Sequence, residues 1–293
     1  MHRQFDRAEG DDVPAPARHH AAVPRYLRSQ GALDLSFRRR GDATVIDRSY
    51  QSGCVRMRLP RREHPAERPC AVLINTAGGV AEGDRIEQHI RWDAESCATV
   101  TSQAAEKIYR ALAHGSEIST RIEVGPGADA EWLPQETILF DGARLRRDAR
   151  IMLDENVSFL GVEAIVLGRA AMGETMRAGS LRDRMRIWRG GRLIYADTLA
   201  LDADVERLMA GAAIGGGASA MAVLVHASAG AAALIDPVRE ALEQIRGRGA
   251  ASTWNGLLAV RLLAPDGETL RHDIAAALAV LRGQRPLPRV WRC

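Results

Sequence analysis

Apolar and polar residues alternate along much of the chain between residues 31 and 203. Residues 33–37 and 85–92 each place their apolar side chains at every second position, which is the period of a half-buried β-strand. Residues 181–188 and 192–199 repeat this pattern on either side of a short Arg-Gly-Gly link, which predicts a hairpin. We therefore expect a body built mainly of β-strands.

The pattern changes after about residue 203. Around residues 235–247 the sequence predicts a helix, with Asp236 as N-cap, Pro237 at the first helical position and Gly247 as the C-terminal stop. A strand at 256–263 and an amphipathic helix at 269–283 follow. Many strands followed by a few helices argue against a Rossmann-type alternation and favour a mainly β domain.

These patterns divide the chain into a tail and one domain. Residues 1–24 are polar, proline-dotted and aperiodic, so we expect a flexible tail, in which His19 and His20 form either a chance pair or a metal contact. Residues 25–293 form the single domain, with a β body at about 31–203 and a helix-containing part at about 204–293.

Composition excludes several classes of protein. The 293 residues include 40 basic and 37 acidic side chains, a net charge of +3 that does not favour binding to nucleic acid. No signal sequence or membrane-spanning segment is evident. The four cysteines form no C-x-x-C pair, so we interpret them as structural thiols of a cytoplasmic protein.

Three carboxylates lie in one of the most apolar segments, residues 131–142, at Glu131, Glu136 and Asp141. A buried, unpaired carboxylate costs several kcal/mol, so such groups meet water, a cation or a metal. The glycine-rich residues 75–84 lack the spacing of a phosphate loop; we expect a tight turn in which Asp84 either caps the turn or faces an internal passage. Lys107, the only lysine, is either a specific ammonium group or a surface residue.

Catalytic signatures are missing from the sequence. The eight histidines form no H-x-H or H-E-x-x-H group, and there is neither a G-x-S-x-G elbow nor a cysteine nucleophile motif. We therefore expect a protein that is not an enzyme. Glu163 and Glu174 are two further acids among apolar or small residues, and each suits a turn or the rim of a pore better than a catalytic centre.

Four segments, taken in order and spacing, resemble the urease accessory protein UreD family, called UreH in some systems, and the resemblance runs from about Gly31 to the C-terminus. They are "NTAGGVAEGD" (75–84), "TSQAAEKIYR" (101–110), "EWLPQETILFDG" (131–142) and "GVEAIVLGRAAMGE" (161–174). The resemblance implies a mainly β, two-layered, β-helix-like stack of sheets with a few C-terminal α-helices.

The resemblance also implies a function in urease maturation. Members of the family bind apo-urease together with UreF and the GTPase UreG, and they deliver nickel through a water-filled tunnel. No cofactor is held permanently; nickel is in transit. Four acids match acidic positions of the family motifs and are carried over as transient nickel contacts lining the tunnel, with Glu163 as a looser candidate: Asp84, Glu136, Asp141 and Glu174.

Two other functions remain open at this stage. A β-fold hydrolase would use two of these carboxylates as acid and base, and would need them about 5–9 Å apart with separated pKa values. A passive protein-interaction module would share the partners but have no nickel route.

Overall fold

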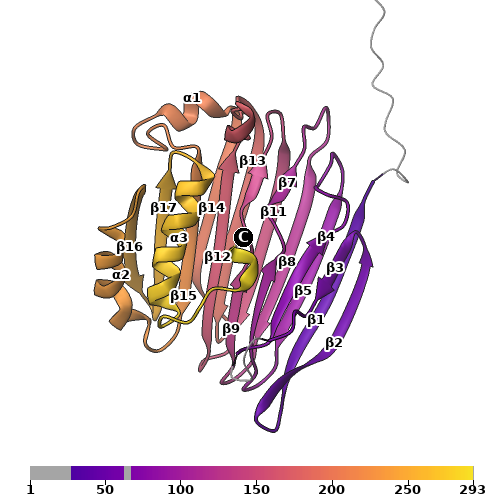
Figure 1. The fold of residues 1–293 in the computed structure, drawn as a ribbon, viewed down its shortest axis with the longest axis vertical. Helices are drawn as coiled ribbons and strands as arrows, with labels where there is room; N and C mark the ends of the chain where they lie inside the picture. Colours follow the sequence, from indigo (N-terminus) through magenta and orange to yellow (C-terminus); the bar gives the residue numbers. More distant parts are fainter. Residues whose placement is uncertain (1–27, 63–66, 293) are drawn as a thin grey trace, which may run out of the picture.

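Two stacked β-sheets and a partial outer layer of helices form the protein (Figure 1). The computed structural model describes residues 28–62 and 67–292. The expected tail at residues 1–24, including His19 and His20, lies outside the described residues. The mainly β fold class with C-terminal helices is confirmed.

The first sheet, sheet A, has seven strands in the order β14-β13-β11-β8-β5-β1-β2. Its central strands pair in parallel, and only the two edge hairpins pair antiparallel. The strands are β1 (Gln30–Arg40), β2 (Ala43–Gly53), β5 (Arg85–Trp92), β8 (Ser116–Val124), β11 (Arg144–Leu153), β13 (Ala178–Arg189) and β14 (Arg192–Asp204).

The second sheet, sheet B, follows the order β16-β17-β15-β12-β9-β6-β4-β3, and two short strands, β7 and β10, pair beside β12. Its strands are β3 (Val55–Arg58), β4 (Cys70–Asn75), β6 (Cys97–Ser102), β7 (Glu106–Ile108), β9 (Asp129–Leu133), β10 (Thr137–Leu139), β12 (Ser158–Leu167), β15 (Ala220–Ala227), β16 (Arg248–Trp254) and β17 (Leu257–Ala264).

The chain coils between the sheets, so that successive turns stack in parallel. From β4 it crosses to β5, returns to β6, crosses to β8, and repeats this course through β9, β11, β12 and β13. Each turn adds one strand to each sheet, and Ile118 of one turn pairs with Ile86 of the turn before it and Arg147 of the turn after it. This is the expected β-helix-like stack.

Helices lie on the outer face of sheet B at one end (Figure 1). They are α2 (Ile235–Leu242) and α3 (Gly267–Leu281), with the 3₁₀ turns η3 (Ala231–Leu234) and η4 (Arg289–Trp291). Helix α1 (Val205–Ala210) instead packs against β13 and β14 of sheet A, and the 3₁₀ turn η2 (Ala170–Met172) lies between β12 and β13 in the sequence. The predicted ends of α2 were wrong. The helix continues directly from η3, so Asp236 lies in its first turn, and it ends at Leu242, before Gly247.

Gly247 has a different role from the predicted helix stop. Its backbone N–H, like that of Arg246, donates to the buried carboxylate of Asp273 on α3, at 2.8 and 2.9 Å respectively. This contact fixes the entry into β16. At the other helix, α3 begins two residues before the predicted start, because the side chain of Asp266 accepts a hydrogen bond from the Thr269 N–H at 2.7 Å.

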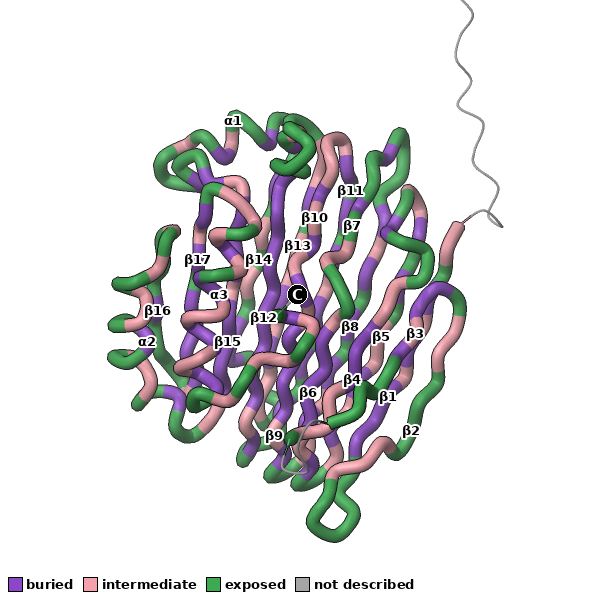
Figure 2. Tube along the Cα trace, viewed as in Figure 1, coloured by how far each residue is buried: buried purple, intermediate pink, exposed green. Residues whose placement is uncertain are grey.

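The apolar core has two parts, one on each side of sheet B. The larger part fills the space between the two sheets and includes Phe37, Trp92 and Phe159, all fully buried. The smaller part lies between sheet B and the helices and includes Leu133 and Leu258. Figure 2 shows the buried strands at the centre of the stack and exposed segments at both edges.

Replacement of Asp266 by alanine tests the N-cap of α3. We expect Asp266→Ala to lower the free energy of unfolding by about 1 kcal/mol, because the Thr269 N–H loses its acceptor. Asp266→Ser keeps an acceptor and is the matched control. Urea denaturation followed by circular dichroism measures both; equal losses in the two variants would contradict the capping role.

Candidate functional site

Two cavities lie between sheets A and B and meet at one residue, Glu163 of β12. The first has a volume of about 290 Å³ and is lined by side chains of β4, β5, β8 and β9 among others. The second has a volume of about 460 Å³ and is lined mainly by β13, β14, β15 and β17. The interior of the stack is therefore hollow on both sides of Glu163.

A buried ionic cluster separates the two cavities. Arg147 on β11 and Asp183 on β13 come from sheet A, and Glu163 comes from sheet B. The guanidinium binds both oxygens of Asp183, with Nε–Oδ1 at 2.8 Å and Nη2–Oδ2 at 2.7 Å, and its Nη1 lies 2.7 Å from Glu163 Oε2. Arg147 thus joins the two sheets across the interior.

Neutral donors and acceptors complete this cluster. The Nη1 of Arg147 also donates to Thr137 Oγ1 at 3.0 Å, and the indole Nε1 of Trp132 donates to Glu163 Oε1 at 3.2 Å. Burial raises the pKa of Glu163; Arg147 opposes this shift and Asp183 adds to it. With one guanidinium against two carboxyl groups, the cluster has a spare negative charge whenever both carboxyls are ionised.

A second titratable group, Glu106 on β7, lines the first cavity. Burial raises its pKa to about 7, although the amide of Asn75 donates to its Oε1 at 3.0 Å. The neighbouring Lys107 is exposed and also lines this cavity.

The four acids nominated from the sequence lie outside both cavities. Asp84 is buried and accepts from the backbone N–H groups of Ser29 and Ala81, so it caps the glycine turn, where Gly78 and Gly83 have φ of +77°. Glu136 pairs with Arg271 of α3 at 3.0 Å. Asp84 immediately precedes β5 of sheet A, and Glu136 immediately precedes β10 of sheet B.

Asp141 and Glu174 do come together. Glu174 accepts from the Asp141 N–H at 2.8 Å and forms an ion pair with Arg169, while Asp141 accepts from the N–H of Arg177 and of Ala178. These hydrogen bonds and the nearby arginines hold both pKa values below their ordinary range, despite partial burial, which acts in the opposite direction.

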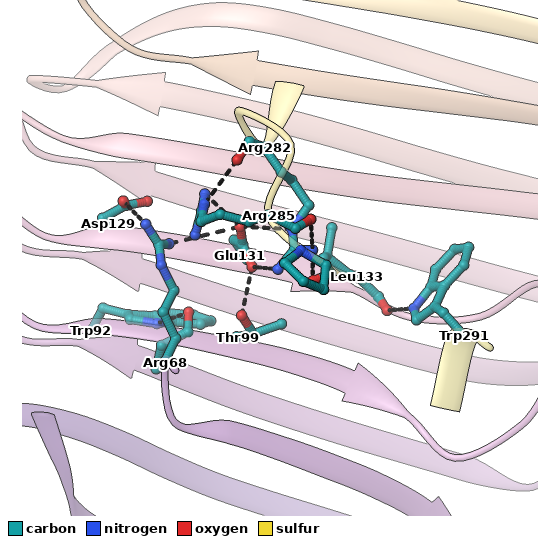
Figure 3. Close-up of polar contacts among 11 residues, drawn as sticks. Arg68, Trp92, Thr99, Asp129, Glu131, Leu133, Arg282, Arg285 and Trp291 are labelled. Carbon is teal, nitrogen blue, oxygen red and sulfur yellow. Dashed lines mark hydrogen bonds and ion pairs between the residues drawn. The ribbon is translucent and has the colours of Figure 1, made fainter. Parts of the chain in front are cut away.

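Glu131, the first carboxylate of the apolar segment 131–142, is paired with cations. Its fully buried carboxylate lies on the outer face of sheet B and contacts Arg282 at 3.0 and 3.1 Å and Arg285 at 3.0 Å (Figure 3). Burial alone would raise the pKa of Glu131. The hydrogen bonds and charge of Arg282, the hydrogen bond from Thr99 and the charge of Arg285 together lower this pKa below its ordinary value.

Sequence reasoning missed three residues of the interior site. Glu106 lies within the segment 101–110 but was not singled out, and Arg147 and Asp183 belong to no motif. Arg147 nevertheless stands in the alternation of β11 at an inward position, between Leu145 and Ala149. An arginine at a core position signals a buried carboxylate partner. In residues 28–62 and 67–292, no group of three or more His, Cys, Asp or Glu side chains is arranged to hold a metal ion. No helix of these residues is both long and apolar enough to cross a membrane.

The raised pKa of Glu106 gives a pH dependence. The folded state binds this proton up to about pH 7, whereas the unfolded chain releases it near 4.5, so stability falls as pH rises between these values. We expect Glu106→Gln to flatten the stability profile across this window. Chemical denaturation at several pH values measures the slope; an unchanged slope would contradict the burial of this carboxyl group.

The ionic cluster gives a second test. Arg147→Met leaves two buried carboxyl groups without their cation, and we expect a loss of about 3–5 kcal/mol in the free energy of unfolding. The matched triple variant Arg147→Met, Glu163→Gln, Asp183→Asn removes all three charges and recovers more than half of that loss. Denaturant titration compares the two; a single variant as stable as the natural chain would show that the guanidinium does not hold the sheets together.

The fold and these motifs agree with comparisons to known proteins. A model of the UreD urease accessory protein family matches residues 29–292. The chain is 45% identical to the urease accessory protein UreD of Rhizobium etli over 271 residues, covering 92% of this chain and 98% of the relative. It is 47% identical to the urease accessory protein UreD 2 of Methylorubrum populi, covering 92% of each chain.

A third relative, the urease accessory protein UreD of Azorhizobium caulinodans, is 42% identical over 92% of this chain and 99% of its own length. The resemblance seen in the four motif segments is therefore confirmed along nearly the whole length of the described domain. The chain belongs to the UreD family of urease accessory proteins.

Proposed function

We propose that this protein acts in the cytoplasm as a nickel-delivery scaffold for urease, together with UreF and the GTPase UreG, and that nickel crosses it between the two sheets. The observation that supports this route is the meeting of two interior cavities at the carboxyl group of Glu163. The protein holds no resident cofactor in this proposal, because nickel is its cargo.

The lining of the cavities suits an ion in transit. Nickel is high in the Irving–Williams order, and a cage of cysteine and histidine would release it slowly. A conduit needs sites that attract the ion and let it leave. Glu106 and Glu163 supply single carboxyl groups in succession, one in the first cavity and one at the meeting point.

Proton exchange accompanies transfer through these carboxyl groups. Because the pKa of Glu106 is about 7, it is partly protonated near neutral pH, and an arriving cation displaces the proton. At Glu163 the cation competes with the guanidinium of Arg147 for the same carboxylate. Both features weaken binding and favour release.

In this proposal, the acids carried over from the family motifs contact nickel outside the two cavities. Asp141 and Glu174, which lie together, are the stronger candidates for a transient nickel contact before or after the interior route. Asp84 and Glu136 are weaker candidates, because Asp84 is buried and no hydrogen bond of either carboxylate among the described residues joins it to a second acid.

A bulky side chain inside the first cavity tests the route. Gln88 of β5 lines this cavity, whereas the neighbouring Glu87 is exposed on the same strand. We expect Gln88→Trp to lower the nickel content of co-expressed urease several-fold, because the indole fills the passage. Glu87→Trp, the matched control, leaves the nickel content unchanged.

The measurement is nickel per urease by mass spectrometry, combined with a pull-down of UreF and apo-urease by each variant. Normal nickel loading with Gln88→Trp, in a variant that folds and binds its partners, would contradict the interior route. The protein would then be a passive interaction module.

A further inference from the structure

A groove of about 800 Å³ lies on the outer face of sheet B, on the opposite side of that sheet from the interior cavities. Helix α3 covers this face over β15 and β17. The segment after α3 then crosses β9, where the Trp291 indole donates to the carbonyl of Leu133 at 3.0 Å (Figure 3). The groove opens beyond this segment, above β3 and β4.

The floor of the groove is apolar and its rim is cationic. Val72 and Ile74 of β4 form part of the floor, and Leu59 and Leu287 stand on either side. Eight arginines line the groove, against one carboxylate among the described lining residues, Glu67. The arginines are Arg58, Arg61, Arg62, Arg68, Arg282, Arg285, Arg289 and Arg292.

Two carboxylates, the buried Glu131 and the partly exposed Asp129, position three of these arginines. Glu131 binds Arg282 and Arg285, and Asp129 forms an ion pair with Arg68 (Figure 3). Two carboxylates therefore hold three guanidinium groups, so these five side chains together carry a net positive charge. Arg68 also approaches Glu131, with its Nη1 3.7 Å from Oε1, so one buried carboxylate lies beside all three guanidinium groups. Guanidinium groups that are already held in place bind further carboxylates at low entropic cost.

We propose that this groove is the docking site for an extended acidic segment of a partner protein. The carboxylates of the segment bind the rim arginines, and its apolar side chains cover Val72, Ile74 and Leu287. A nucleotide fits less well, because none of the described residues that line the groove is aromatic and could stack on a base. A lone phosphate would leave the apolar floor in contact with water. This inference does not depend on passage of nickel.

Fluorescence anisotropy on the full chain tests the proposal. The probe is a fluorescein-labelled peptide that alternates glutamate with leucine, and its control has glutamine in place of every glutamate. We expect the acidic peptide to bind, with an affinity that falls as salt is raised, and the glutamine peptide not to bind. Equal binding of both peptides, or no binding of either, would overturn the proposal.

Matched arginine variants locate the site. Arg58 and Arg61 are exposed residues of the groove, whereas Arg146 and Arg182 are exposed neighbours in register on the outer face of sheet A. We expect Arg58→Gln with Arg61→Gln to weaken peptide binding about fivefold, and Arg146→Gln with Arg182→Gln to leave it unchanged. Equal effects in the two pairs would show non-specific attraction and contradict the proposal.

Two competitors identify other occupants. Displacement of the peptide by inorganic phosphate or GTP at concentrations comparable to that of the peptide would show a phosphate site and refute the acidic segment. Light scattering reports whether the chain forms a dimer that Arg58→Gln with Arg61→Gln dissociates; such a dimer would assign the groove to a second copy. The proposal is supported if light scattering shows a monomer and if neither phosphate nor GTP displaces the bound peptide.

Discussion

The bidentate contact of Arg147 with Asp183, extended to Glu163 across the stack, is the interaction on which the interior depends. Two carboxyl groups in an apolar interior, left without a compensating cation, cost about 3–5 kcal/mol, a large share of a domain's stability margin. The guanidinium meets this need and ties sheet A to sheet B at one point. On either side of that point the sheets leave room for a cavity, so one ionic bridge both divides the interior and keeps polar groups within it.

Sheet B carries a second cluster of the same chemistry on its other face. Glu131 of β9 and Glu163 of β12 belong to adjacent strands, yet Glu131 faces the C-terminal segment and Glu163 faces the interior. Arginine suits both places because its planar fork binds carboxylates through two parallel hydrogen bonds, which a lysine ammonium cannot do. The two clusters give the faces of one sheet separate roles in our proposals: a passage for an ion inside and a docking groove outside.

Residue patterns predicted the strands well, because inward side chains such as Ile86, Ile90 and Trp92 recur with period two. They could not predict which strands pair, since the parallel partners come from successive turns of the coil, as Ile86 and Ile118 do. The end of α2 was missed because Gly247 is held by Asp273, a residue distant in sequence. The motifs drew attention to Asp84 and Glu136, and to Glu163 only as a looser candidate, whereas Arg147 and Asp183, its partners in the interior cluster, are brought to it only by the fold.

The central claim is that nickel passes between the sheets at Glu163. Anomalous diffraction at the nickel absorption edge, from crystals of this protein with its urease partners grown in the presence of the ion, tests the claim most directly. The account predicts a partly occupied nickel peak beside Glu163, between the two cavities, with the Arg147 guanidinium displaced from that carboxylate. Nickel peaks confined to the outer surface, with the interior cluster undisturbed, would contradict it.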